Sequence, residues 1–317
     1  MKPNLNEINW KRVFIVFALL AISLPFFSFA GHNKKIYVDS NAGSEQDGSL
    51  THPYKTIGKA LEKAKDNTEI HISNGTYKEN LEIPSGVDIY GQNSDKTIIK
   101  ARNGGKAVIS LKGSAKLVDL TIREGKNGIK IANAGRVKIF SCNIEKNDDD
   151  GILIYSGSSK RSIEDNNQVM LSQVKIDHNG KAGIYSEKRS LIIYKSNISD
   201  NKSDGVSFAS GVKAWIGSST FVSNSGSGVA VVLDGAQIYT KNNVYSNNKR
   251  EGIEIVAYGA GGRIDINKSK IRNNGNYGIS RVDKKAVNQG IWGGLTVENT
   301  TYLYTNKGQL SPIFRIY

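Results

Sequence analysis

The sequence has very little cysteine. A single residue, Cys142, among 317 excludes an intrachain disulfide, so the chain must be held together by packing and hydrogen bonds. Two classes of repeat protein are also excluded. No Leu-rich frame recurs along the chain, and the apolar residues lack the spacing of three and four that helical repeats need.

Acidic residues are outnumbered. The chain has 43 Lys and Arg against 29 Asp and Glu, a formal charge of +14. This excess favours an anionic partner such as an acidic polysaccharide, a cell-wall polymer, a nucleic acid or a membrane surface. The alternative is that these charges only keep the protein surface solvated, because the lysines are spread along the chain and do not form one block. Because aromatic and basic residues do not interleave, we expect no nucleic-acid partner, and favour a polysaccharide or cell-wall glycan.

Charge is absent from residues 13–30, VFIVFALLAISLPFFSFA, which follow Lys2, Lys11 and Arg12. The small residues Ser28 and Ala30 suit a signal peptidase, so we expect residues 1–30 to be an export signal cleaved before Gly31. A retained N-terminal membrane anchor is the alternative, since the run approaches the lower bound of about 18 residues for a spanning helix. The membrane would then be contacted only through residues 13–30. Either reading predicts a secreted or cell-surface protein.

One motif recurs about every 23 residues, which is typical of a solenoid. It reads Ile-x-x-Asn-x-x-x-Gly-Ile. The glycines followed by Ile or Val are Gly128, Gly151, Gly183, Gly205, Gly228, Gly252 and Gly278. The asparagines assigned to the motif are Asn147, Asn179, Asn201, Asn224, Asn247 and Asn274.

Apolar and polar residues alternate within each repeat, and β-branched types dominate. Coils of about 22–24 residues suit three short strands and three turns, so the sequence predicts an all-β protein, a parallel β-helix. We expect each Asn to occupy a left-handed turn position and to hydrogen-bond its counterparts in a ladder. The Gly would relieve strain in the turn, and the next β-branched residue would point inward. A second ladder is expected at Asn143, Asn197, Thr220 and Asn243.

The open end of such a stack must be covered. Residues 54–65 place Ile57, Ala60, Leu61 and Ala64 on one helical face, and Pro53 suits the first turn. We therefore expect an N-terminal amphipathic capping helix. The predicted single domain, residues 31–317, comprises a cap at 31–67, coils at 68–310 and a tail at 311–317, with an irregular last coil around Asn306.

The stretches IYVDSNAGSEQDGSLTHPYKTIGKAL and NGTYKENLEI resemble the N-terminal cap of secreted proteins in the pectin lyase-like superfamily, and the repeats resemble the same superfamily. The resemblance covers nearly all of residues 36–306. It implies a right-handed parallel β-helix and a role with carbohydrate, on a scaffold that hosts lyases, hydrolases, epimerases, esterases and non-catalytic proteins.

The enzyme motifs of this superfamily are mostly absent. The segment VKIDH, Val174 to His178, matches the Val-Trp-Ile-Asp-His motif of one class of pectate lyases except for Lys175. The partner motif Arg-x-Pro-x-x-Arg, the His-Gly pair of polygalacturonases and the Asp-Pro-His of mannuronan epimerases do not occur. These absences leave open whether the protein is an enzyme.

Two function classes remain. The first is a polysaccharide lyase, in which Asp148, Asp149 and Asp150 would hold Ca²⁺ and Lys181 or Lys130 would remove a proton from a uronate. The second is a non-catalytic surface scaffold that binds acidic glycan. Its expected substrate-binding residues are four basic side chains around an insertion near residues 157–168, and two tyrosines. They are Lys160, Arg161, Lys188, Arg189, Tyr155 and Tyr185. Tyr155, Tyr185, Trp215 and Trp292 are candidates for stacking on sugar rings, and Trp215 lies on a different strand from Tyr185.

Overall fold

The computed structural model describes residues 34–132, 135–155, 168–258, 261–283, 295–297 and 302–310. The expected signal peptide or anchor, the insertion carrying Lys160 and Arg161, and the expected tail lie outside the described residues. All the described residues belong to one compact unit, residues 34–317. In the described part, no helix is long and apolar enough to cross a membrane.

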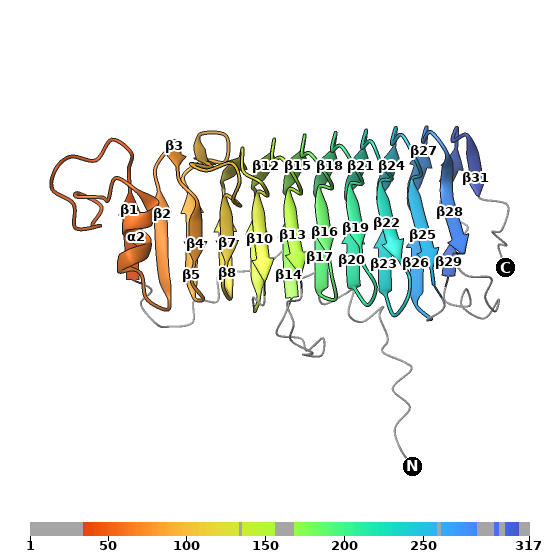
Figure 1. Cartoon of the computed structure of the whole chain (residues 1–317), viewed down its shortest axis with the longest axis horizontal. Helices are drawn as coiled ribbons and strands as arrows, with labels where there is room; N and C mark the ends of the chain where they lie inside the picture. The colour runs from red at the N-terminus through yellow and green to blue at the C-terminus, as the bar shows by residue number, and fades with distance from the viewer. Residues whose placement is uncertain are drawn as a thin grey trace, which may run out of the picture. The chain divides into compact units, whose positions relative to one another are not determined.

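The described chain forms three parallel sheets, which it visits in turn, once per coil (Figure 1). Sheet A contains β1 (Lys34–Val38), β2 (Thr68–Ile72), β5 (Val87–Gly91), β8 (Ala115–Val118), β11 (Val137–Phe140), β14 (Gln168–Ser172), β17 (Ser190–Tyr194), β20 (Lys213–Gly217), β23 (Gln237–Lys241), β26 (Arg263–Asn267) and β29 (Leu295–Val297). Sheet B contains β3 (Gly75–Lys78), β6 (Thr97–Lys100), β9 (Thr121–Arg123), β12 (Asn143–Glu145), β15 (Lys175–Asp177), β18 (Asn197–Ser199), β21 (Thr220–Val222), β24 (Val244–Ser246), β27 (Lys270–Arg272) and β30 (Tyr302–Tyr304). Sheet C contains β4 (Leu81–Ile83), β7 (Ile109–Leu111), β10 (Ile129–Ala132), β13 (Ile152–Tyr155), β16 (Ile184–Ser186), β19 (Val206–Phe208), β22 (Val229–Val232), β25 (Ile253–Ala257), β28 (Tyr277–Asp283) and β31 (Gly308–Leu310). The expected all-β parallel helix is confirmed.

The core is a set of inward-facing columns of side chains. In sheet C, Ile129 pairs with Ile152 and Ile152 with Ile184, and all three are fully buried. The same column continues to Ile279 through residues that are at most 1% exposed. Because strand side chains alternate between faces, each coil also displays an outward column. The prediction that the residue after each motif Gly points inward is confirmed.

The asparagine ladder is also confirmed, with one change of member. Asn147 Nδ2 donates to Asn179 Oδ1 at 2.9 Å, and each later Asn repeats this bond. The remaining members are Asn201, Asn224, Asn248, Asn274 and Asn306. The assignment of Asn247 was wrong, because the Asn four residues before Gly252 is Asn248. The left-handed turn position was also assigned wrongly: it lies one residue before the ladder, as at His178 (φ 56°) and Asn247 (φ 57°).

Of the residues expected in the second ladder, Asn243 is a member, whereas in the two preceding coils the ladder lies one residue earlier than expected. Ser196 Oγ accepts a hydrogen bond from Val174 N at 3.4 Å, and Ser219 Oγ accepts one from Ser196 N at 3.2 Å. Asn243 Oδ1 then accepts Ser219 N at 2.8 Å, and these residues are buried. Asn197 and Thr220 instead lie on the outward face of sheet B, where the Thr220 hydroxyl donates to Asn197 Oδ1.

None of the motif glycines has a positive φ, so backbone conformation does not explain them. They are required because the neighbouring coil packs against them too closely for a side chain. A Cβ on Gly128 would lie 2.6 Å from the carbonyl oxygen of Gly151 and 2.8 Å from the ladder amide of Asn147. The coil above thus occupies the space that any larger residue would need. The expected relief of turn strain is therefore not the reason for these glycines.

The cap contains one helix, α2 (Ile57–Lys63), which buries Ile57 and Ala60 against the first coils. Thr56 is its N-cap, so Pro53 precedes the helix and does not occupy its first turn. The carboxylate of Glu79 accepts the N–H groups of Ile57 and Gly58, both at 2.8 Å. Strand β1, inside the expected cap, already pairs with β2 in sheet A.

Candidate functional site

The three aspartates before β13 have separate roles. Asp149 Oδ1 pairs with Lys181 Nζ at 3.0 Å, and Asp150 Oδ1 accepts the N–H of Ala182 at 3.1 Å. Asp148 is exposed. Among the described residues, no three Asp, Glu, His or Cys side chains are grouped so that they could hold a metal ion. The turn as it stands therefore does not fit a Ca²⁺ site built from these aspartates.

The two lysines proposed as bases are also engaged. The hydrogen bond to Asp149 raises the pKa of Lys181, so this ammonium keeps its proton and is a poor general base. Lys130 Nζ lies 5.2 Å from the ring centroid of Tyr155 on the outward face of sheet C. These contacts favour structural roles for both lysines.

The expected binding residues only partly come together. Tyr185 points outward from β16, and its hydroxyl donates to Glu187 at 3.2 Å. Lys188 is exposed, whereas Arg189 is buried and burial lowers the pKa of its guanidinium. Lys160 and Arg161 lie outside the described residues, so the expected basic patch remains a prediction.

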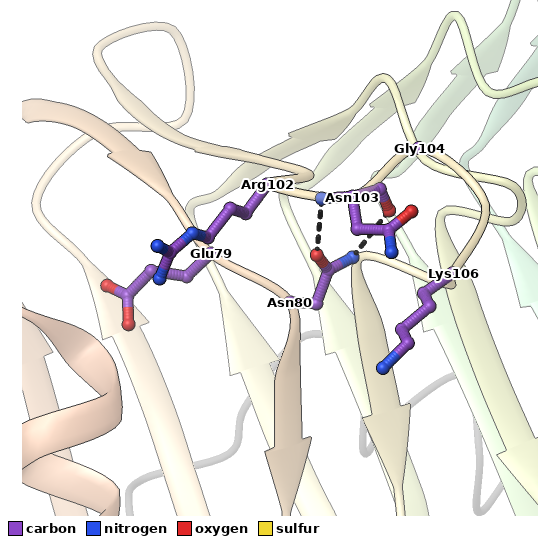
Figure 2. Close-up of a pocket in the computed structure, with 6 residues that line it drawn as sticks. All are labelled: Glu79, Asn80, Arg102, Asn103, Gly104 and Lys106. Carbon is purple, nitrogen blue, oxygen red and sulfur yellow. Dashed lines mark hydrogen bonds between the residues drawn. The ribbon is translucent and has the colours of Figure 1, made fainter.

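A shallow hollow of about 700 Å³ lies between the first coils and is lined by Glu79, Asn80, Arg102 and Lys106, among others (Figure 2). Asn80 Oδ1 accepts Asn103 N at 2.7 Å, and its Nδ2 donates to the carbonyl of Ala107 at 2.8 Å. Glu79 is engaged with α2. Glu79 and Asn80 therefore bond the chain itself, which indicates structural roles for these two residues.

The outward face of sheet A differs from the rest of the surface. Five large, partly buried apolar or aromatic side chains occupy neighbouring strands there, in two adjacent columns. We call this set the aromatic face; it consists of Met170, Ile192, Tyr194, Trp215 and Tyr239. The corresponding column of sheet C is chemically mixed, with Lys130, Ser207 and Glu254 among its members. Aromatic residues therefore concentrate on one sheet.

Trp215 is the centre of the aromatic face. Its ring lies over Gly217 on the same strand, where a Cβ would overlap the Cη2 atom. The ring centroid is 5.8 Å from that of Tyr194 on β17, and Tyr239 is its register partner on β23. Since the next outward position holds no side chain, the indole lies down along the sheet. The partly exposed indole, tilted by 36° from the Tyr194 ring, offers a face that a ring-shaped ligand can stack on.

Sequence reasoning missed this face. Trp215 was a candidate for stacking on sugar rings, but it was placed only on a different strand from Tyr185, because the repeats were aligned on the Gly-Ile strand of sheet C. Alignment of the segments LIIY, AWIG and IYTK on their inward residues would have placed Ile192, Trp215 and Tyr239 in one outward column.

Comparison with known proteins places the chain in a broad structural class. An uncharacterized protein of Bacillus subtilis (strain 168), YwoF, is 24% identical over 170 residues, which is 50% of this chain and 35% of that protein. An alginate lyase from Paenibacillus sp. str. FPU-7 is similar in structure, with a TM-score of 0.62 at 14% identity over 90% of this chain and 97% of the lyase. Pectate lyase Pel9A gives a TM-score of 0.56 at 13% identity over 89% and 81% of the two chains.

XylC in complex with xylose gives a TM-score of 0.63 at 10% identity, over 87% of this chain and 69% of XylC. At these identities the likeness concerns the fold. A family model described as "right handed beta helix region" matches residues 63–170 and 162–302, which is most of the sequence. The chain therefore belongs to the right-handed β-helix family, as the sequence predicted.

Proposed function

We propose that this protein binds an acidic polysaccharide outside the cytoplasm, with the glycan chain lying along the outward face of sheet A. The observation that carries the proposal is the aromatic face. Its side chains come from successive coils, so they repeat at about the 4.8 Å spacing of paired strands. A polymer of repeating rings is a ligand that matches such a repeating surface.

The composition of the face suits sugar rings. An aromatic ring presents a flat apolar surface to C–H groups, and a tyrosine or tryptophan adds a polar edge for hydrogen bonds. A contiguous apolar patch on a sheet that faces solvent is uncommon unless it binds something. Lys138 and Lys213 lie exposed on strands of the same sheet, and the chain carries an excess of positive charge. These cations favour a glycan with carboxylates.

The comparisons support the proposal only through the fold, since the similar structures named above include two polysaccharide lyases and a complex with xylose. The location rests on residues 1–30, which carry the export pattern. Whether the bound glycan is also cleaved is a separate question, which depends on proton-transfer groups on the same face.

The test is a binding assay of the purified protein with polygalacturonate, alginate and neutral xylan, by retardation in a gel that contains each glycan. Trp215→Ala is the test variant. Tyr185→Ala is the matched control, since Tyr185 is an outward aromatic on sheet C. We expect the first to lose retardation and the second to keep it. Equal retardation of Trp215→Ala and the unaltered protein would exclude the aromatic face as the binding surface.

A further inference from the structure

Five ionisable side chains lie together on the outward face of sheet A, toward its N-terminal edge. They come from the three neighbouring strands β2, β5 and β8, and we call them the ionisable cluster: Glu69, His71, Asp88, Tyr90 and Lys116. Glu69 is the register partner of Asp88, and His71 is that of Tyr90. The cluster is on the same sheet face as Trp215, about 24 Å from it if β5 and β20 are five strand spacings of 4.8 Å apart.

His71 is held on both faces and at one edge. Its ring stacks between Tyr37 and Tyr90, with centroid distances of 5.5 and 5.1 Å. Its Nε2 lies 3.1 Å from Glu69 Oε2. A carboxylate only accepts hydrogen bonds, so Nε2 carries the proton and Nδ1 of the neutral ring is the basic nitrogen. The imidazole side chain is 32% exposed, so solvent and ligand reach it.

Tyr90 is placed as a proton donor. Lys116 Nζ donates to the Tyr90 hydroxyl at 3.3 Å, so the phenolic oxygen accepts one hydrogen bond and keeps its own proton to donate. Burial raises the pKa of Tyr90 most, followed by the charges of Asp88 and Glu69 and a hydrogen bond to Asp88, so the phenol stays protonated and a glycan oxygen would take its proton in place of Asp88. Asp88 Oδ1 accepts Lys116 N at 2.8 Å and thereby fixes the strand that carries the lysine.

We propose that the ionisable cluster is a catalytic centre that cleaves the glycan by elimination at a uronate residue; this inference rests on the proposed function. His71 Nδ1 takes the proton from C5, the carbon that carries the carboxylate. The C–H electron pair forms the C4=C5 double bond, the C4–O glycosidic bond breaks, and the departing oxygen takes the Tyr90 proton. The proton on His71 then returns to the Tyr90 oxygen, and no oxidant or reductant is needed.

The surroundings of the cluster fit this reaction. The Lys116 ammonium can face the uronate carboxylate and reduce the charge that opposes removal of the C5 proton. His71 and Tyr90 are stacked neighbours, so base and acid lie on the same side of a sugar placed over them. Hydrolysis by Glu69 and Asp88 is disfavoured, because both carboxylates are already engaged, Glu69 with the His71 ring and Asp88 with the main-chain N–H of Lys116.

Other charges bear on the cluster from the neighbouring strands. Lys35 on β1 is the register partner of Glu69, and Lys138 on β11 is that of Lys116. Glu69 thus lies beside Lys35, Asp88 lies beside Lys116, and Tyr37 covers the other face of His71. Lys35 and Lys138 therefore add to the positive charge of Lys116 that an anionic glycan meets at the cluster.

The experiment measures the ultraviolet absorbance of the unsaturated uronate product when the purified protein is incubated with polygalacturonate and alginate. Tyr90→Phe and Tyr37→Phe form a matched pair, since both rings stack on His71 but only Tyr90 contacts Lys116. We expect Tyr90→Phe and His71→Gln to lose about a hundredfold or more in rate, as for a general acid or base. Tyr37→Phe should keep most of the activity.

Glu69 acts through His71 and is a positioning residue. We expect Glu69→Gln to lower kcat with KM and glycan retardation nearly unchanged, because the amide no longer stabilises the positive charge that the ring gains when His71 takes the C5 proton. Binding of the same glycans is measured in parallel by gel retardation. If the unaltered protein is retarded but forms no unsaturated product, the catalytic centre is refuted and the proposed function stands. If the unaltered protein is not retarded by any glycan, both the proposed function and the catalytic centre are refuted. Equal losses of activity in Tyr37→Phe and Tyr90→Phe would refute the assignment of Tyr90 as the proton donor.

Discussion

Trp215 lies flat on sheet A because Gly217, two residues later on the same strand, has no side chain beneath the ring. Both residues belong to β20, where they face outward in adjacent columns. A flat indole exposes one whole face, whereas an upright ring would expose its edges. The pair therefore determines the shape of the aromatic face as much as Trp215 itself does.

Gly217→Ala should weaken glycan binding with little loss of stability. The added Cβ meets the far end of the Trp215 ring, which can swing away, and no backbone atom is among its closest contacts. We expect a fall in affinity of roughly tenfold or less, below the loss for Trp215→Ala, where an aromatic hot spot of about 2 kcal/mol or more is removed. Gel retardation and thermal unfolding measure the two effects. A large drop in melting temperature for Gly217→Ala would contradict this account.

The repeat predicted the fold because architecture in a β-helix depends on residues that recur in every coil. Gly-Ile and Asn positions must satisfy the same packing and hydrogen bonds each time, so they appear as a period in the sequence. One coil was misaligned by a single residue at Asn247 and Asn248, since two adjacent asparagines both matched the residue type. Only the fixed distance of four residues to Gly252 distinguishes them.

Asn248→Ala and Asn247→Gly should therefore differ strongly in stability. Asn248 Oδ1 accepts the main-chain and side-chain N–H groups of Asn224, and its Nδ2 donates to the Phe221 carbonyl. Its removal leaves buried groups unsatisfied, at about 1–3 kcal/mol for each. Asn247 is exposed with φ 57°, which Gly adopts without strain. Urea unfolding should show a large loss for the first and almost none for the second; the reverse order would place the ladder at 247.

The candidate site was harder to predict, because charge runs are conspicuous in a sequence and outward columns are not. Asp150 was interpreted as a metal ligand, yet Asp204, in the corresponding position of a later coil, accepts Ser227 N at 2.7 Å as Asp150 accepts Ala182 N. A hydrogen bond of the same kind in two coils indicates an architectural role. The residues of the aromatic face, by contrast, lie a whole coil apart in sequence and become neighbours only after the coils are stacked.

Asp150→Asn should cost no stability at neutral pH. Burial raises the pKa of Asp150 above the ordinary value of 3.8, so the ionised form is disfavoured in the folded protein. The stability that this carboxyl contributes is fully present below that ordinary value and is lost as pH rises through the raised pKa. An asparagine keeps the acceptor for Ala182 N without the charge. Relative to the unaltered protein, the variant should become more stable as pH rises from acid to neutral. Urea unfolding at acid and at neutral pH measures this difference. The opposite trend would mean that the ionised Asp150 carboxylate stabilises the fold.

The charge around the aromatic face predicts how binding responds to salt. Lys138 and Lys213 are exposed on strands of sheet A. Their joint replacement by Gln should lower the affinity for polygalacturonate roughly two- to tenfold at low ionic strength, since exposed charge pairs contribute up to about 1 kcal/mol each. The difference should vanish near 1 M salt, where the screening length is about 3 Å. Neutral xylan is the control ligand, because its binding through aromatic stacking should be the same in both proteins. If the double variant lost affinity for xylan and polygalacturonate equally, the two lysines would stabilise the binding surface and would not interact with the carboxylates of the glycan.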